Sequence, residues 1–93
     1  MTDRETLRIL VIRDGGMLVA QCLEHDICTQ AEDIDQLQER MEKLIDLERV
    51  ESAERTGQDF GDIEAAPEEF HNMWDRAKMF ADTGSPFSMA LAA

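Results

Sequence analysis

Two short apolar segments separated by a pair of glycines constrain the fold of this chain more than any other feature. The first spans residues 7–13 and the second spans residues 17–22, and both consist mainly of β-branched and other apolar residues. The link between them, Asp14-Gly15-Gly16, supplies consecutive glycines, which adopt the positive φ angles of a tight hairpin turn. We therefore predict a β-hairpin. Its first strand shows little polar alternation in its middle, so we expect it to be covered on both faces.

A third strand and a capped helix are predicted to follow the hairpin. Residues 24–26 form a polar break, and residues 27–30 favour a short third strand that completes an antiparallel meander. Asp33 is a favourable N-cap, and Gln36 stands three residues later, as in a capping box. Apolar residues then recur at helical spacing: Ile34, Leu37, Met41, Leu44 and Ile45.

A loop and a second helix are predicted next. The first helix is expected to extend to Arg55 and to stop at Gly57, and a loop is expected over residues 57–66. A second helix is predicted over residues 67–83, because proline at position 67 suits the first turn of a helix. The apolar residues of this helix share one stripe: Phe70, Met73, Trp74, Ala77 and Phe80.

The chain ends with an apolar segment that no local pattern places. Gly84 and Pro86 are expected to terminate the second helix, and residues 84–93 show neither a cap nor a periodicity. The sequence thus predicts a single α+β domain. A three-stranded antiparallel meander and an amphipathic helix form a β-β-β-α core over residues 7–56, and a second, C-terminal helix follows it.

The net charge of the chain indicates which classes of partner it can bind. The 93 residues include 21 acidic residues and 9 Lys or Arg, which gives a net charge of −12. A surface this negative repels nucleic acid and anionic membranes, and it attracts a basic protein. The first residues lack the apolar region of a secretory signal, and no apolar stretch approaches the roughly 18 residues of a membrane span. We therefore expect a cytoplasmic location with reduced cysteines.

The residues that suggest chemistry lie between Cys22 and Cys28. A structural zinc site needs four ligands, and a catalytic cysteine needs an electropositive site that favours its thiolate. This segment supplies three Cys or His ligands, and Glu24 and Asp26 make it acidic. We interpret the two cysteines as packed thiols facing the core, and Glu24 and His25 as residues that hold a bend. No metal, cofactor or catalytic residue is predicted, and the chain is not expected to be an enzyme. A small-ligand or enzymatic site at Cys22, Glu24 and His25 is the weakest alternative.

Two surfaces are candidates for binding a partner. Acidic residues follow one face of the first helix, and that face is either simply solvated or meets a basic partner. The apolar stripe of the second helix either packs in the core, which we favour, or forms a groove for a partner, because Trp and Phe dominate binding hot spots. The candidate partner-binding residues are Asp35, Glu39, Glu42, Asp46, Phe70 and Trp74.

The segment from Asp14 to about Leu47 resembles the HicB-like family, the antitoxins of HicA–HicB modules. The matching features are the Asp14-Gly15-Gly16 turn, residues 18–28 (LVAQCLEHDIC), and the acidic amphipathic helix that follows residues 29–33 (TQAED). With residues 7–13, the resemblance covers about half of the chain. It implies a β-β-β-α fold similar to part of a double-stranded-RNA-binding domain. It also implies an antitoxin-like role, in which the chain sequesters a small basic protein such as a ribonuclease toxin.

The sequence also departs from the family pattern. Ala31 stands where the family usually has Gly, Leu18 where it usually has an aromatic residue, and Leu37 where it usually has Ala. Many family antitoxins carry a C-terminal helix-turn-helix or ribbon-helix-helix, whereas this chain has one acidic helix around residues 68–80, as in a stand-alone branch of HicB-like proteins. This departure argues against the operator binding that such family antitoxins perform.

Two functions follow from these observations. The first is a protein-binding module, and the alternative is a stand-alone homo-oligomer with a structural or regulatory role. A three-stranded sheet has two edges with unpaired backbone groups, and one helix cannot cover both of its faces. A homodimer or a larger assembly is therefore expected in either case.

Overall fold

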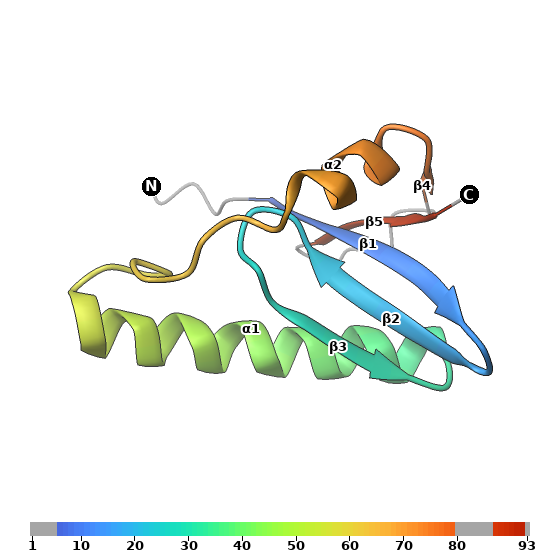
Figure 1. Cartoon of the computed structure of the whole chain (residues 1–93). Coiled ribbons are helices and arrows are strands. Elements are labelled where there is room, and N and C mark those ends of the chain that lie inside the picture. The colour runs from blue at the N-terminus through green and yellow to red at the C-terminus, as the bar shows by residue number, and fades with distance from the viewer. Residues whose placement is uncertain (1–5, 80–86, 93) are drawn as a thin grey trace.

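The computed structural model describes residues 6–79 and 87–92 of the chain (Figure 1). It confirms the α+β class and the predicted β-β-β-α order of the first half. The elements are β1 (Leu7–Asp14), β2 (Met17–Cys22), β3 (Cys28–Ala31), α1 (Ile34–Thr56), α2 (Glu68–Trp74), β4 (Lys78–Met79) and β5 (Phe87–Leu91).

The predicted hairpin and meander are present. Strands β1 and β2 pair antiparallel up to Asp14 and Met17, and the turn between them places Gly15 at a φ of 62°. Strand β3 pairs antiparallel with β2 on the other side. Gly15 therefore supplies a positive φ in the hairpin turn, whereas Gly16, for which the sequence also predicts one, does not.

Among the described residues, the sheet contains five strands instead of the predicted three, in the order β3-β2-β1-β5-β4. Strand β5 lies within the apolar segment that sequence patterns did not place, and it pairs parallel with β1 from Leu7 and Phe87 to Val11 and Leu91. Strand β4 pairs antiparallel with β5. The parallel pairing joins residues about 80 positions apart, and no local pattern encodes a contact of that range.

Helix α1 begins and ends where the sequence predicts. Asp33 is its N-cap, and the Asp33 carboxylate accepts a hydrogen bond of 2.8 Å from the backbone N–H of Gln36. Gly57 is its C-cap, with a left-handed φ of 82°. The apolar stripe of α1 packs on one face of the sheet, where Leu37, Met41 and Ile45 are buried.

Helix α2 is shorter than predicted. It begins at Glu68, with Pro67 as N-cap, and it ends at Trp74 instead of residue 83. The backbone N–H groups of Arg76 and Ala77 donate to the carbonyls three residues earlier, which tightens the chain into a turn, and Lys78–Met79 then pairs with β5. Strand pairing replaces the helix here. Phe80 and the predicted stop at Gly84 and Pro86 lie outside the described residues.

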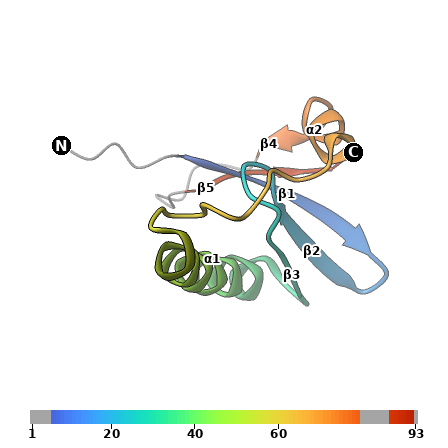
Figure 2. The ribbon, with the colours of Figure 1, turned by 60° about the vertical axis from the view of Figure 1, so that its left-hand side comes forward.

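The sheet lies between α1 and α2 (Figure 2). An apolar cluster lies on each side of it, one under each helix. The larger cluster lies between the sheet and α1 and contains Ile9, Val11, Cys22 and Met89. The smaller lies under α2 and is centred on Leu10, Leu23 and Ala66. Ile9, Leu10 and Val11 have no exposed surface, so β1 is covered on both faces, as predicted.

Candidate functional site

Four acidic residues lie along one flank of α1. Asp35, Glu39, Glu42 and Asp46 are spaced by four, three and four residues, which places them in one row along a helix. Asp35, Glu39 and Asp46 are exposed, and Glu42 is half-buried. We call this row the acidic flank.

Two of the four carboxylates already have a cation beside them. The Glu39 carboxylate lies 3.0 Å from Nζ of Lys43, and the Asp46 carboxylate lies 3.0 Å from Nη1 of Arg49. Asp35 and Glu42 form no ion pair within residues 6–79 and 87–92. The acidic flank therefore keeps net negative charge at its outer surface.

The other two predicted site residues lie on the opposite side of the sheet. Phe70 and Trp74 are half-buried and pack, together with Met73, on the cluster of Leu10 and Leu23. The guanidinium of Arg8 lies over the Trp74 ring, 5.9 Å from its centroid. These aromatic side chains thus contribute to the core under α2. Because the sheet stands between α1 and α2, the six predicted residues do not form one surface.

The β2–β3 turn is a structural clamp. Glu24 accepts hydrogen bonds from the backbone N–H and the Nε of Arg8, at 2.8 and 2.5 Å. The Asp26 carboxylate accepts a bond of 2.9 Å from Nε2 of Gln21, and its backbone N–H donates to the carbonyl of Glu64. The Glu24 carboxylate therefore contacts β1, and the Asp26 carboxylate contacts β2. This geometry agrees with the interpretation that the turn holds a bend.

His25 takes part in a stack of three side chains. Its ring lies 3.9 Å from the ring of Phe60, centroid to centroid, with 14° between the planes. The guanidinium of Arg49 lies 5.5 Å from the centroid of the same Phe60 ring. The stack ties the β2–β3 turn to the loop after α1 and to α1 itself.

The two cysteines do not face each other. Cys22 has no exposed surface and lies in the cluster under α1. Cys28 is exposed, which corrects the prediction that both thiols face the core. Cys28 stands opposite Gln21 in the β2–β3 register, and opposed residues share a face, so Cys28 points to the side away from Cys22.

The residues of the alternative small-ligand or enzymatic site, Cys22, Glu24 and His25, each have different surroundings. The Cys22 thiol is buried among apolar side chains, and the His25 ring stacks on Phe60. Among residues 6–79 and 87–92, no group of three or more His, Cys, Asp or Glu side chains is arranged to hold a metal ion.

The loop after α1 contains contacts that sequence patterns did not reveal. Ser52 is fully buried, and its hydroxyl accepts a 2.7 Å hydrogen bond from the backbone N–H of Phe60. Arg55 donates two hydrogen bonds to Asp62, at 2.6 and 3.1 Å, and these bonds hold the pKa of the Asp62 carboxyl below its usual value. A mid-helix serine and a loop phenylalanine have no pattern that predicts such contacts.

Comparison of the chain with protein-family models, with curated proteins and with solved structures finds no match in any of the three. Within the described part of the chain, none of the helices combines the length and the apolar character that crossing a membrane requires. The row of four carboxylates on α1 makes the acidic flank the surface on which a functional hypothesis rests.

Proposed function

We propose that this chain is a protein-binding module, similar in role to a HicB-like antitoxin, that binds a basic protein through the acidic flank of α1. The observation that carries the proposal is the row of four carboxylates on a helix that is capped at both ends. Caps at Asp33 and Gly57 fix the two ends of the helix, so the carboxylates are held in register before a partner arrives.

The ion pairs on the flank are easily exchanged for contacts with a partner. The side chains of Lys43 and Glu39 are 76% and 66% exposed, and exposed pairs contribute only about 0 to 1 kcal/mol. An Arg or Lys of the partner can therefore replace Lys43 at little cost. Asp35 and Glu42 offer two further carboxylates that no described cation neutralises.

The net charge supports the same partner class. A chain with a charge of −12 attracts a basic protein over a distance and speeds its encounter. Binding then covers the basic surface by which a toxin-like protein would contact RNA. In this proposal the module acts in the cytoplasm as a steric and electrostatic block, with no cofactor.

The first prediction concerns the rate of association. The probe is a basic protein recovered with this chain by pull-down from the native cell. The double variant Asp35→Lys/Glu42→Lys is expected to slow association by about tenfold at low salt, because charges near an interface act mainly on the on-rate. The difference is expected to shrink as salt rises. Stopped-flow or surface-based kinetics measure both effects.

A matched control distinguishes the effect of the acidic flank on association from the effect of the net charge of the chain. Glu69→Lys/Asp75→Lys makes the same change in net charge at exposed positions in and beside α2, on the other side of the sheet. This control is expected to slow association far less. The exposed substitutions should each change the unfolding free energy by about 0.5 kcal/mol or less, and the half-buried Glu42→Lys by more, so urea unfolding must first show that both double variants are folded. Equal on-rates for the two double variants would remove the acidic flank from the mechanism.

A further inference from the structure

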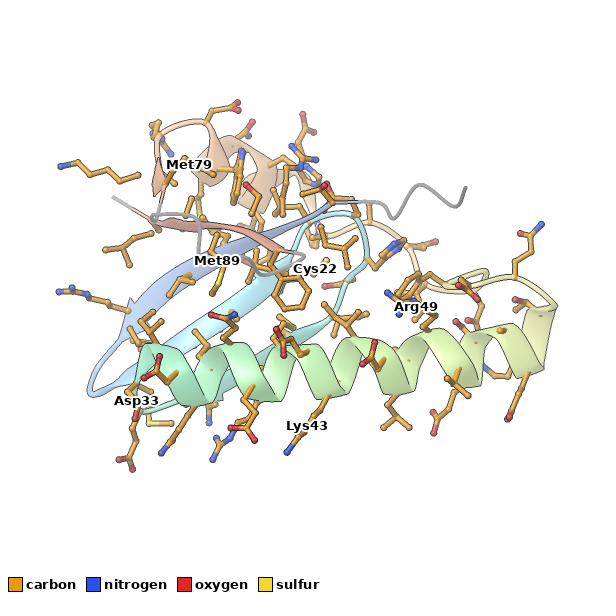
Figure 3. All side chains as sticks on the ribbon, turned by 180° about the vertical axis from the view of Figure 1, so that it is seen from behind. Cys22, Asp33, Lys43, Arg49, Met79 and Met89 are labelled. Atoms are coloured by element: carbon orange, nitrogen blue, oxygen red, sulfur yellow. The ribbon has the colours of Figure 1, made fainter. Side chains whose placement is uncertain are left out.

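The solvent face of α1 carries two exposed apolar side chains. Among the described residues, the large hydrophobic side chains that are exposed are Leu47 at 51%, Val50 at 55% and Met79 at 58%. Leu47 and Val50 are three residues apart and therefore share a face of α1. Lys43 stands four and seven residues before them, and it points directly away from the sheet (Figure 3). Leu47 and Val50 thus lie at the outermost face of the helix.

These residues belong to a longer row with the spacing of a helix-pairing surface. Positions separated alternately by four and three residues form the seam along which two helices pack in a coiled coil. On the outer face of α1 the row is basic toward its start, apolar in its middle and acidic at its end. We call it the outer seam, and it consists of Gln36, Arg40, Lys43, Leu47, Val50 and Glu54.

The charges along the outer seam complement those of a second seam that runs in the opposite direction. Two copies of α1 in antiparallel orientation bring Leu47 of each against Val50 of the other. The same alignment brings Lys43 of each against Glu54 of the other. A parallel pair would instead oppose two Lys43 side chains and two Glu54 side chains, and such like-charge contacts are unfavourable. We propose that the outer seam of α1 binds the outer seam of a second copy of this chain, antiparallel.

The sheet edges are less suited to joining two copies. On the β3 edge, Nη1 of Arg40 donates a 2.7 Å hydrogen bond to the backbone carbonyl of Gln30. As far as the chain is described, the edge strand β4 consists of Lys78 and Met79, and lysine is a residue type that protects strand edges. Strand β5 pairs with β1, so β1 is not an edge. The expected homodimer therefore joins through a helix in this proposal.

The partner of the outer seam differs from that of the acidic flank. Arg40 and Lys43 would repel a basic protein approaching the seam, whereas a second copy offers Glu54. The self-association does not depend on the proposed binding of a basic protein, and either one can fail without the other.

The dimer is expected to be weak and to strengthen with salt. Stable interfaces bury about 1,200 to 2,000 Å², and a seam with two apolar side chains per copy falls below that size. Two chains of charge −12 also repel each other, and salt screens this repulsion. We expect a dissociation constant between about 1 μM and 1 mM.

Sedimentation equilibrium of the full chain tests the association. The average mass of the wild type is expected to rise clearly above that of one chain by about 1 mM, and to do so at lower protein concentration when salt is added. Leu47→Glu is expected to keep the chain monomeric. Met79→Glu also replaces an exposed apolar side chain with Glu, at a similarly exposed position on β4, and should leave association unchanged. A monomeric wild type, or a dimer lost in Met79→Glu and kept in Leu47→Glu, overturns the proposal.

Charge exchange tests the antiparallel register. Lys43→Glu and Glu54→Lys each oppose like charges twice per dimer, and each is expected to weaken association by about tenfold. An equimolar mixture of the two single variants should recover it as a heterodimer, and so should the double variant Lys43→Glu/Glu54→Lys. The double variant still lacks the Glu39–Lys43 pair, so its recovery cannot come from that pair. Failure of both the mixture and the double variant to associate would exclude this register.

Discussion

At the scale of single residues, Phe60 shows how tertiary contacts override local preference. It has a φ of 57°, and among the described residues it is the non-glycine residue with a positive φ. The left-handed region costs an ordinary residue about 1 to 2 kcal/mol. Burial of the ring against His25 and Arg49, and the hydrogen bond from the Phe60 N–H to buried Ser52, offset this cost.

Burial along α1 gives a prediction about stability. Leu37 has no exposed surface, so Leu37→Ala is expected to lower the unfolding free energy by about 2 to 5 kcal/mol, as is usual for an emptied core site. Leu44 is only half-buried, and Leu44→Ala should cost less. Leu47→Ala makes the same change on the exposed face and should stay within about 0.5 kcal/mol. Urea unfolding followed by circular dichroism, at low protein concentration, measures all three. Equal losses for Leu37→Ala and Leu47→Ala would contradict the orientation of α1.

At the scale of elements, what the sequence predicts depends on the range of the contacts. Helix α1 and the hairpin are encoded by neighbouring residues, namely the caps at Asp33 and Gly57 and the glycines of the turn, and both are predicted well. Strand β5 and the early end of α2 depend on pairing between distant segments. The apolar stripe continues to Ala77 and therefore predicts a longer helix. In the structure Ala77 still packs on the cluster under α2, but it does so from the turn that follows α2.

The same reasoning applies to the candidate site. The spacing of Asp35, Glu39, Glu42 and Asp46 predicts a shared flank of α1, because helical geometry alone decides it. Whether Phe70 and Trp74 join that flank depends on which face of the sheet each helix covers, and local patterns do not determine this. The stack of His25, Phe60 and Arg49 joins three separate segments, and local patterns do not determine it either.

The parallel pairing of β5 with β1 gives a prediction for that element. Ala90 has no exposed surface and stands opposite Leu10, so Ala90→Asp places a carboxylate in an apolar cluster. It is expected to cost about 3 kcal/mol or more. Ser88→Asp makes a similar change on the same face, but at a half-buried position opposite Arg8, and should be tolerated. Thermal unfolding compares the two. If both variants unfold like the wild type, the C-terminal segment does not join the sheet.

At the scale of the whole molecule, the sheet divides the chain into two sides with different surfaces. The side of α1 carries both the acidic flank and the outer seam, which are neighbouring faces of one helix. Two antiparallel copies joined at the seam would leave both acidic flanks accessible along the sides of the helix pair. A dimer could therefore bind two copies of a basic partner, and the proposed association and the proposed function are compatible.

The whole-molecule charge leads to a prediction about nucleic acid, which the β-β-β-α order alone would not give. Binding to duplex DNA or RNA depends on Lys and Arg that neutralise phosphates, and the chain has 9 such residues against 21 acidic ones. Several of the basic residues, such as Arg8 and Arg55, are already paired with carboxylates. No gel shift is expected with low micromolar protein at physiological salt.

Replacing the four carboxylates of the acidic flank with Lys raises the charge by two units at each position and changes the net charge from −12 to −4. This variant is expected to bind duplexes weakly at low salt and to release them as salt rises. A wild-type shift that survives moderate salt would show that this fold binds nucleic acid despite its charge.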